Sequence, residues 1–309
     1  MTAISVVIPT RGRPDLIGRS VLSVLANDHP DFDVTVVDQS DDAATGLVVE
    51  EIARRNRRLR YVHTLPPGLS RAYNVGARLT AGPILAFTDD DCVARPDWLT
   101  AIAKAFAAEP DAELLYGRVA LPRDLAGSAG EVPVLPIARA ERIDRRSGFR
   151  LYGMGANYAM RRRLLARVEG FDEMLGGGGP LRSSQDFDLQ YRAYRAGATV
   201  LLRPEVVVDH YGLRTAAQWP ATLRAYGIGD GAFYMKHVRC GDARAASLLV
   251  RRLSRTAARQ LRHLVDRRRP SQAHYLRAVL EGIRLSAGYP IDRPRRMYLP
   301  RTNAVGRMP

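Results

Sequence analysis

Apolar residues recur along the first hundred positions in two alternating patterns. Short runs rich in Val, Ile and Leu predict buried β-strands over residues 4–9, 33–38, 59–63 and 83–88. Between these runs, apolar positions at helical spacing predict helices over 14–26, around 48–52 and over 69–79. Strands that alternate with helices are typical of βαβ units, so the chain is expected to adopt an α/β fold with a parallel arrangement in its first part.

The pattern changes beyond residue 110, where longer irregular connections such as the Gly-, Pro- and Ala-rich stretch 123–136 appear. We therefore expect the second half to complete a mixed sheet. Near the C-terminus, apolar residues line one face of a predicted helix and arginines line the opposite face. The apolar stripe is Ala246, Leu249, Val250, Leu253, Ala257, Leu261 and Leu264, and the arginine face is Arg244, Arg251, Arg252, Arg255, Arg259 and Arg262. A second amphipathic helix carries Leu276, Val279, Leu280 and Ile283.

Net charge is concentrated in this C-terminal region. Residues 243–309 hold 16 arginines against three acidic residues, which places +13 of the +15 formal charge there. Nucleic-acid modules interleave aromatic with basic residues to stack bases, whereas the tyrosines here are scattered, so no nucleic-acid partner is expected. The pattern fits a helix that docks on the domain, or one that associates peripherally with an anionic membrane. A genome-wide bias towards Arg and Ala is the plainer explanation of part of this charge.

Other compositional features exclude several classes of protein. The two cysteines, Cys92 and Cys240, indicate neither a disulfide framework nor a zinc site. No apolar stretch is long enough to cross a bilayer, and the N-terminus has no signal-peptide pattern. The expected location is cytoplasmic. The basic helices suggest an alternative, which is peripheral attachment to the inner face of the plasma membrane.

Polar side chains that follow the predicted strands are the candidates for chemistry. Ligands of open α/β sheets bind at the carboxyl ends of strands, which selects residues 10–12, 38–40 and 89–91. The strongest signal is the triplet 89–91, because three adjacent carboxylates repel each other unless a cation neutralises them. Oxygen ligands favour Mg²⁺ or Mn²⁺, either of which also binds a diphosphate. An acidic turn before the next helix is the alternative interpretation.

Six motifs in order then resemble family 2 of the glycosyltransferases, which use the GT-A nucleotide-diphospho-sugar transferase fold. The resemblance runs from about residue 3 to residue 210, and each motif alone is weak. The motifs are Ser5-Val6-Val7-Ile8-Pro9-Thr10, Val36-Val37-Asp38-Gln39-Ser40, residues 68–76 before the acidic triplet, Gly155-Ala156-Asn157-Tyr158-Ala159-Met160, Gly170-Phe171-Asp172-Glu173 and Gln185-Asp186-Phe187-Asp188-Leu189.

The resemblance implies an inverting transferase that moves a sugar from a nucleotide-diphospho-sugar donor to a hydroxyl of a glycan or lipid-linked acceptor. It implies that the triplet is the metal-binding DxD motif, with Asp91 as the direct ligand, Asp89 in support and His210 as a further ligand. A lone His at a strand end is as often structural. The residues implied in binding the nucleotide-sugar are Pro9, Thr10, Arg11, Asp38, Ser40, Arg71, Asn74, Asp89 and Asp90.

Asp186 is the candidate catalytic base, because the acceptor hydroxyl must lose a proton as it attacks the anomeric carbon. The alternative is a residue that only caps the following helix. The family usually has Glu where Gln185 stands, and often has Arg at the position of Tyr73. The resemblance further implies acceptor contacts at Gly155, Ala156, Asn157 and Gln185.

The predicted organisation is a GT-A catalytic domain over 1–215, with a mixed central sheet flanked by helices. Its halves would bind the nucleotide-sugar (1–92) and the acceptor (93–215). A C-terminal helical extension would follow over 216–290, and a poorly ordered Arg/Pro-rich tail over 291–309. Polysaccharide or cell-envelope glycan synthesis is the commonest role in the family and is therefore the default expectation.

Two other functions compete with glycosyl transfer. A sugar-1-phosphate nucleotidyltransferase would share the nucleotide fold and the metal, but residues 10–14 are too short for the Gly-rich loop of those enzymes. A non-catalytic binding module would use the basic C-terminal region on an anionic membrane or a nucleic acid.

Overall fold

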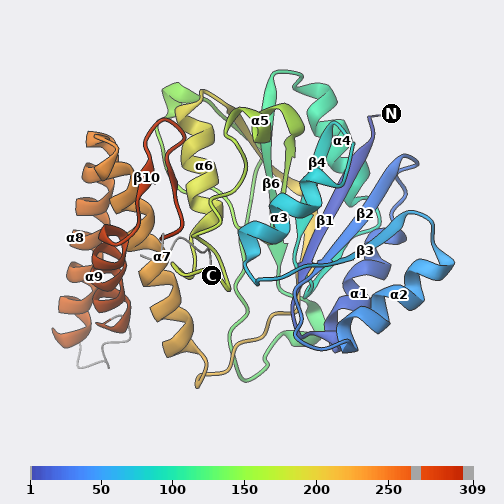
Figure 1. Ribbon diagram of the computed structural model, residues 1–309, viewed down its shortest axis with the longest axis horizontal. Helices are drawn as coiled ribbons and strands as arrows, with labels where there is room; N and C mark the ends of the chain where they lie inside the picture. The colour runs from blue at the N-terminus through green and yellow to red at the C-terminus, as the bar shows by residue number, and fades with distance from the viewer. Residues whose placement is uncertain (1, 266–272, 302–309) are drawn as a thin grey trace. The chain divides into compact units, whose positions relative to one another are not determined.

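The computed structural model of the chain describes residues 2–265 and 273–301 (Figure 1). They form two compact units. Unit 1 comprises Met1–Pro67, Arg71–Phe171 and Leu189–Thr215. Unit 2 comprises Gly68–Ser70, Asp172–Asp188 and Ala216–Pro309. The segment that carries Asp186 therefore groups with the C-terminal helices, a division that the pattern of the sequence did not suggest.

Unit 1 is built on one mixed sheet, which contains nine strands within the part of the chain that the structure describes. Along the sheet the order is β3-β2-β1-β4-β8-β6-β9-β5, with β7 paired to β9. The first four run parallel, and β8 runs antiparallel to β4 and β6, as the change of pattern beyond residue 110 predicted. The strands are β1 (Ile4–Thr10), β2 (Phe32–Asp38), β3 (Leu59–His63), β4 (Ile84–Thr88), β5 (Cys92–Ala94), β6 (Ala112–Ala120), β7 (Glu141–Ile143), β8 (Asn157–Arg161) and β9 (Thr199–His210).

Helices cover both faces of this sheet because successive strand residues point to opposite sides. Residues such as Ile4, Val6 and Ile8 of β1 pack in a core with apolar residues of α1, α2 and α4. The alternate positions face α3, where Tyr73 meets the ring of Phe87 edge-on at a centroid distance of 5.2 Å. The helices that belong wholly or mainly to unit 1 are α1 (Pro14–Leu25), α2 (Ala44–Arg55), α3 (Leu69–Arg78), α4 (Trp98–Ala108), α5 (Arg162–Arg167) and α6 (Gln185–Arg195). Two short 3-10 turns, Arg123–Leu125 and Arg145–Ser147, lie in the connections.

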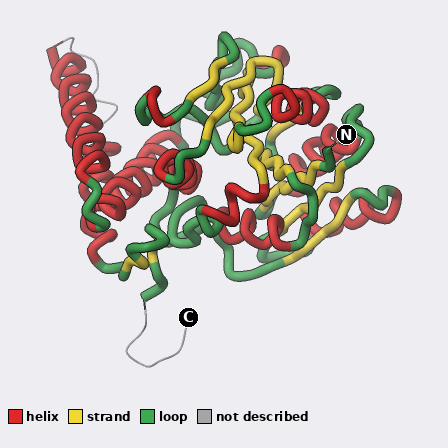
Figure 2. The backbone as a smooth tube through the Cα atoms, turned by 90° about the horizontal axis from the view of Figure 1, so that it is seen from above, coloured by secondary structure: helices red, strands yellow, loops and turns green. Residues whose placement is uncertain are grey.

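Within the described residues, unit 2 contains three helices, the short stretch Gly68–Ser70, the segment Asp172–Asp188 with the first turn of α6, and a C-terminal hairpin (Figure 2). The helices are α7 (Trp219–Arg239), α8 (Ala243–Val265) and α9 (Ala273–Ala287). Strands β10 (Ile291–Asp292) and β11 (Met297–Tyr298) pair antiparallel, and the Tyr298 side chain is only 4% exposed. The expectation of a poorly ordered tail is therefore wrong for 291–301, because an aromatic anchor fixes the hairpin. Residues 302–309 lie outside the described residues.

The predicted amphipathic helix α8 is present, but it packs with a different face from the one expected. Ala245, Leu249 and Thr256 are buried, whereas Val250 and Leu261 of the predicted apolar stripe are 62% and 64% exposed. The side chain of Leu264 lies outside the described residues. Arg252, assigned to the arginine face, turns inward and contacts Asp230 of α7 at 3.2 Å. Among the helices described, none combines the length and apolar character needed to span a membrane.

Candidate functional site

The carboxyl ends of β1, β2 and β4 lie at one edge of the sheet, which gathers the predicted residues of unit 1. The register pairs Thr10 of β1 with Asp38 of β2, and β1 also lies parallel to β4, after which Asp89 follows. Backbone bonds tie this edge together, since the Gln39 N–H donates to Thr10 O at 3.0 Å. The edge therefore brings together three of the segments that the sequence selected.

The acidic triplet is held by the hydroxyl of Thr10 at the end of β1 and by the guanidinium of Arg13 in the loop that follows. Arg13 Nη1 lies 2.6 Å from Asp90 Oδ1 and 2.9 Å from Asp91 Oδ2. The Thr10 hydroxyl donates to Asp90 Oδ2 at 2.8 Å. Burial raises the pKa of Asp90, an effect that the neighbouring Arg13 opposes. Asp90 is thus anchored within the protein, and one guanidinium offsets the repulsion between two carboxylates.

Asp89 and Asp91 differ in their electrostatic surroundings. Burial, together with the charge of Asp91, raises the pKa of Asp89 to about 7. Burial by itself would also raise the pKa of Asp91, but the hydrogen bond and charge of His210, with Arg13, hold it below its usual value. The Tyr73 hydroxyl lies 3.3 Å from Asp89 Oδ1. Near neutral pH, Asp91 is therefore ionised, whereas Asp89 is partly protonated.

His210 completes this cluster from the end of β9. The antiparallel register places His210 opposite Cys92, and His210 Nε2 lies 3.2 Å from Asp91 Oδ1. Its other nitrogen, Nδ1, lies 2.7 Å from the carbonyl of Pro133, which fixes the ring with Nδ1 protonated. Burial by itself would lower the pKa of the imidazole. The hydrogen bond and charge of Asp91 outweigh this effect, so the pKa of His210 lies above its usual value. The ring thus presents Nε2 to the carboxylate.

The donor atoms suit a hard or borderline divalent cation. Asp91, Cys92 and His210 offer ligand atoms within 4.8 Å of one another. Burial raises the pKa of the Cys92 thiol well above its usual value. The Arg13 guanidinium already places a positive charge beside the Asp91 carboxylate, as a bound cation would. The Asp91 carboxylate and the His210 imidazole therefore fit Mn²⁺ or Mg²⁺.

Gly212 leaves space beside these ligands. A Cβ at this position would lie 2.6 Å from His210 Nε2 and 2.8 Å from Asp91 Oδ2. Both distances are shorter than any normal contact, so a larger residue would displace the two side chains. The sequence alone does not single out Gly212 or Arg13, since each becomes informative only when the fold brings it to the triplet.

The predicted nucleoside-binding residues are engaged with one another. Asp38 is fully buried, where its Oδ1 accepts the Ser40 N–H at 2.8 Å and its Oδ2 accepts the Tyr61 hydroxyl at 2.9 Å. Burial and the bond to Asp38 raise the pKa of Tyr61. Ser40 in turn accepts the Gly12 N–H at 2.8 Å. Asp38 thus stabilises the turn after β2, and its contact with the nucleotide-sugar stays a prediction.

Arg11 and the residues of α3 take different positions. Arg11 is exposed and pairs with Asp41 at 2.9 Å, while Pro9 is buried in β1. Asn74 exchanges two hydrogen bonds of 2.9 Å with the backbone of Phe171, which gives it a structural part. Arg71 is half-buried on the same helix.

The predicted acceptor residues of unit 1 do not form a polar surface. Asn157 is fully buried, and its amide accepts from Trp98 Nε1 at 2.9 Å and donates to the carbonyls of Arg118 and Val206 at 2.9 and 3.0 Å. These bonds join Asn157 to α4, β6 and β9, and an acceptor contact of Asn157 stays a prediction. Ala156 is buried and Gly155 half-buried beside it.

Asp186 and Gln185 lie in unit 2, at the start of α6. Asp186 is half-buried, and its Oδ1 accepts the N–H of Phe187 at 2.9 Å. Gln185 is 8% exposed. Its place in the first turn of α6 agrees with the alternative of a helix-terminal residue, and the role as catalytic base stays a prediction.

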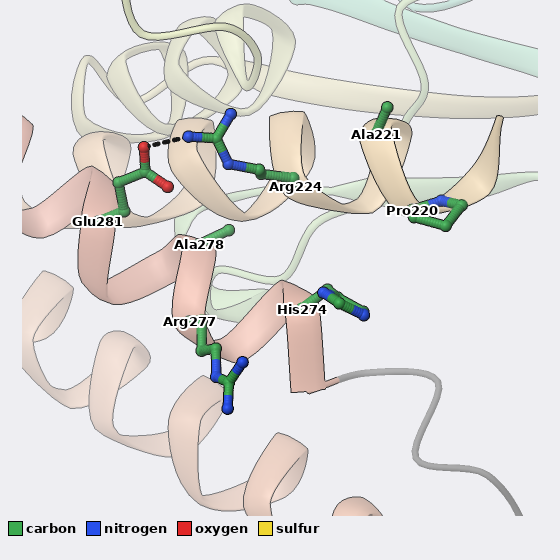
Figure 3. Close-up of a pocket in the computed structure, with 7 residues that line it drawn as sticks. All are labelled: Pro220, Ala221, Arg224, His274, Arg277, Ala278 and Glu281. Atoms are coloured by element: carbon green, nitrogen blue, oxygen red, sulfur yellow. Dashed lines mark hydrogen bonds and ion pairs between the residues drawn. The ribbon is translucent and has the colours of Figure 1, made fainter.

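A separate hollow in unit 2 lies between the start of α7 and α9 (Figure 3). Arg224, His274 and Arg277 line it, and Arg224 pairs with Glu281 at 2.5 Å. None of the predicted site residues lines this hollow.

Comparisons with known proteins agree with this arrangement. Residues 5–167 match the model of glycosyl transferase family 2. The chain is 34% identical over 121 residues to a validoxylamine A glucosyltransferase of Streptomyces hygroscopicus subsp. jinggangensis, covering 37% of this chain and 28% of that protein. It is 26% identical over 255 residues to a pre-mycofactocin glycosyltransferase of Mycobacterium tuberculosis, covering 76% of this chain and 48% of that protein. The chain thus spans less than half the length of these relatives.

Solved structures with the GT-A fold show the same architecture. The mannosyltransferase PcManGT of Pyrobaculum calidifontis, in complex with GDP-Man and Mn²⁺, has a TM-score of 0.64 and 20% identity. That likeness covers 91% of this chain and 87% of the mannosyltransferase. S. aureus TarS 1-349 in complex with UDP-GlcNAc has a TM-score of 0.55 and 20% identity, covering 74% and 66% of the two chains. Both likenesses confirm the predicted GT-A fold. Because the family model spans more than half of the chain, the protein belongs to glycosyl transferase family 2.

Proposed function

We propose that this chain is a divalent-cation-dependent, inverting glycosyltransferase that moves a sugar from a nucleotide-diphospho-sugar to an acceptor hydroxyl. The observation that carries the proposal is the cluster of Asp91, His210 and Arg13 at the carboxyl edge of the sheet. Support also comes from PcManGT and TarS, whose structures hold GDP-Man with Mn²⁺ and UDP-GlcNAc. Polysaccharide or cell-envelope glycan synthesis remains the proposed context.

Each residue has a part in the proposed reaction. A cation held by Asp91 and His210, with Asp89 in support, would supply the Lewis acid that stabilises the charge on the departing diphosphate. Arg13 keeps the carboxylates compatible with burial, and Thr10 orients Asp90 beside them. Asp186 Oδ takes the proton of the acceptor hydroxyl as that oxygen attacks the anomeric carbon. One base and one attack from the face opposite the diphosphate give a single displacement with inversion.

Donor hydrolysis tests this function without knowledge of the acceptor. Purified protein is incubated with UDP-, GDP- and dTDP-sugars with and without Mn²⁺, and sugar release is followed. We expect release from one donor class that depends on the cation, and loss of release in Asp91→Asn and Asp186→Asn with little change in melting temperature. Asp31→Asn is the matched control, because Asp31 is exposed at the amino end of β2. Full activity of Asp91→Asn would contradict the cation site, and full activity of Asp186→Asn would contradict the base.

The exposed side of α8 supports a second part of the proposal, peripheral attachment to an anionic membrane. Val250 and Leu261 expose apolar surface, while five exposed arginines follow along the same helix: Arg244, Arg251, Arg255, Arg259 and Arg262. Arginines beside an apolar stripe are typical of helices that lie in the interface of anionic bilayers.

Flotation with vesicles tests the attachment on the full chain. Vesicles rich in phosphatidylserine should recover the protein, and vesicles of phosphatidylcholine should not. The double variant Val250→Glu with Leu261→Glu should lose recovery, whereas Leu22→Glu with Leu47→Glu should keep it, since Leu22 and Leu47 are also exposed but lie in α1 and α2. Equal recovery of both double variants would contradict the assignment to α8.

A further inference from the structure

Buried polar contacts from α7 hold the chain on both sides of Asp186. Ser184, two positions before Asp186, donates its hydroxyl to Asp230 Oδ1 at 2.8 Å. Asp188, two positions after it, accepts from Lys236 Nζ at 2.6 Å and from His237 Nε2 at 2.9 Å. Asp230, Lys236 and His237 all belong to α7. The same helix therefore makes hydrogen bonds and an ion pair to the residues that flank the proposed base.

The upstream contact fixes a strained stretch of backbone. Arg182 and Ser184 have φ values of 70° and 67°, a conformation that residues with a side chain rarely adopt. Gly229 lets α7 approach this stretch closely, because a Cβ there would lie 2.6 Å from the backbone carbon of Ser183. Strain of this kind persists only where the surroundings impose it, and it concentrates at functional sites.

Asp230 is itself held by the two helices that follow α7. The Tyr275 hydroxyl of α9 donates to Asp230 Oδ2 at 2.5 Å, and Arg252 of α8 lies 3.2 Å from the same oxygen. Arg252 Nε also donates to the Tyr275 hydroxyl at 2.8 Å. The carboxylate that receives Ser184 is thus fixed by both remaining helices of unit 2.

The downstream contact is a group of buried charges. Asp188, Lys236 and His237 have side chains with no exposed surface, and Lys236 also pairs with Asp172 at 2.6 Å. Buried charges need partners with good geometry, so each of these side chains restrains the others.

The C-terminal hairpin extends this group. Tyr298 donates its backbone N–H to Asp172 Oδ2 at 2.9 Å, and Arg296 pairs with Asp242 at 3.0 Å. Arg296 Nη1 also lies 3.5 Å from His237 Nδ1, which favours the imidazole tautomer that donates from Nε2 to Asp188. The segment expected to be a loose tail therefore contributes to the surroundings of Asp188.

We propose that α7 positions the Asp186 carboxylate, with Asp230 and the Lys236–His237 pair as positioning groups that act through Ser184 and Asp188. This inference rests on the proposed role of Asp186 as the base. Ser184 and Asp188 are buried and held, whereas Asp186 between them is half-buried at the first turn of α6. The C-terminal helices and hairpin thereby set the geometry of proton removal.

Variants that release one contact test the proposal. Ser184→Ala removes the hydroxyl and His237→Leu removes the donor to Asp188, while His237→Gln keeps an N–H donor at the position of Nε2. Sugar release from the donor is measured with each variant, alone and combined with Asp186→Asn. Affinity for UDP or GDP with Mn²⁺ is measured by calorimetry, and the melting temperature is recorded. Arg224→Gln is the matched control, because this exposed residue lies on the same helix and pairs across the surface with Glu281.

Ser184→Ala and His237→Leu should lower kcat about 10- to 100-fold, since small misplacements of a catalytic group cost rates of this order. Donor KM and nucleotide affinity should stay unchanged, His237→Gln should restore most of kcat, and neither change should lower the residual rate of Asp186→Asn further. If both variants keep the wild-type kcat while Asp186→Asn is inactive, the positioning role is overturned and the proposed function stands. An equal loss in the Asp186→Asn background would also overturn it, as a general structural defect. Full activity of Asp186→Asn would instead overturn the proposed base.

Discussion

Arg13 allows a sharp test of the electrostatics of the acidic triplet. One of its nitrogens contacts Asp90 and Asp91 at 2.6 and 2.9 Å, and both carboxylates are about 5% exposed. The change Arg13→Met keeps much of the volume and removes the charge. It would leave two buried carboxylates without their cation, in a cluster where burial already raises the pKa of Asp90. We expect the folded state to lose stability for this reason.

The magnitude follows from the contacts. A hydrogen bond to a charged group contributes roughly 1.5–3 kcal/mol. The two contacts share one nitrogen, and the Arg13 side chain is 36% exposed, so solvent screening reduces their combined effect to about 2–4 kcal/mol. For a chain of this size, that loss corresponds to a melting temperature lower by roughly 5–10 °C. Arg11→Met is the control, because the exposed pair of Arg11 with Asp41 should contribute no more than about 1 kcal/mol.

Thermal unfolding with and without Mn²⁺ then separates a cation site from a simple ion pair. If a divalent cation binds beside Asp91, it replaces part of the lost charge, and Mn²⁺ should stabilise Arg13→Met more than it stabilises the wild type. The reasoning is refuted if Arg13→Met melts at the wild-type temperature. It is also refuted if Mn²⁺ raises the melting temperatures of both proteins equally.

Three further predictions concern the same unit. Mn²⁺ affinity should fall about tenfold per pH unit below 7, because the pKa of Asp89 is raised to about 7 and the proton competes with the cation. His210 acts in the same direction, and a calorimetric affinity that is constant from pH 6 to 8 would contradict this. Gly212→Ala should weaken Mn²⁺ binding at least tenfold with little change in urea denaturation, because its Cβ would displace His210 and Asp91. Asn157→Ala should cost about 3 kcal/mol or more in urea denaturation, since it removes the partner of the buried Trp98 N–H and two bonds to the carbonyls of Arg118 and Val206; a loss below about 1 kcal/mol would argue against a structural role for these bonds.

The sequence predicted the first half of the fold closely because local patterns determine it. The four strands of the βαβ region appear within one or two residues of the predicted bounds, since short Val- and Ile-rich runs leave little ambiguity in period. The face with which α8 packs could not be predicted from the sequence. Several faces of one helix can carry apolar residues, and the elements that lie beside the helix decide which of them is buried. Long-range partners decide this, as the contact of Arg252 with Asp230 does here.

The candidate site was predictable only in part for the same reason. Asp89 and Asp91 could be named because adjacent carboxylates after a strand indicate a cation site, and His210 could be named because the family resemblance implies it as a ligand. Arg13 could not be named, since nothing local indicates where a long side chain will point. The contacts of Asn157 could not be predicted, because its buried amide binds three partners that lie far apart in the chain.

Anomalous X-ray scattering from crystals soaked with Mn²⁺ and a nucleoside diphosphate tests the central claim most directly. The account predicts a manganese peak within bonding distance of Asp91 and His210, with Arg13 moved away from Asp91. Manganese bound elsewhere, with the contact between Arg13 and Asp91 intact, would contradict it.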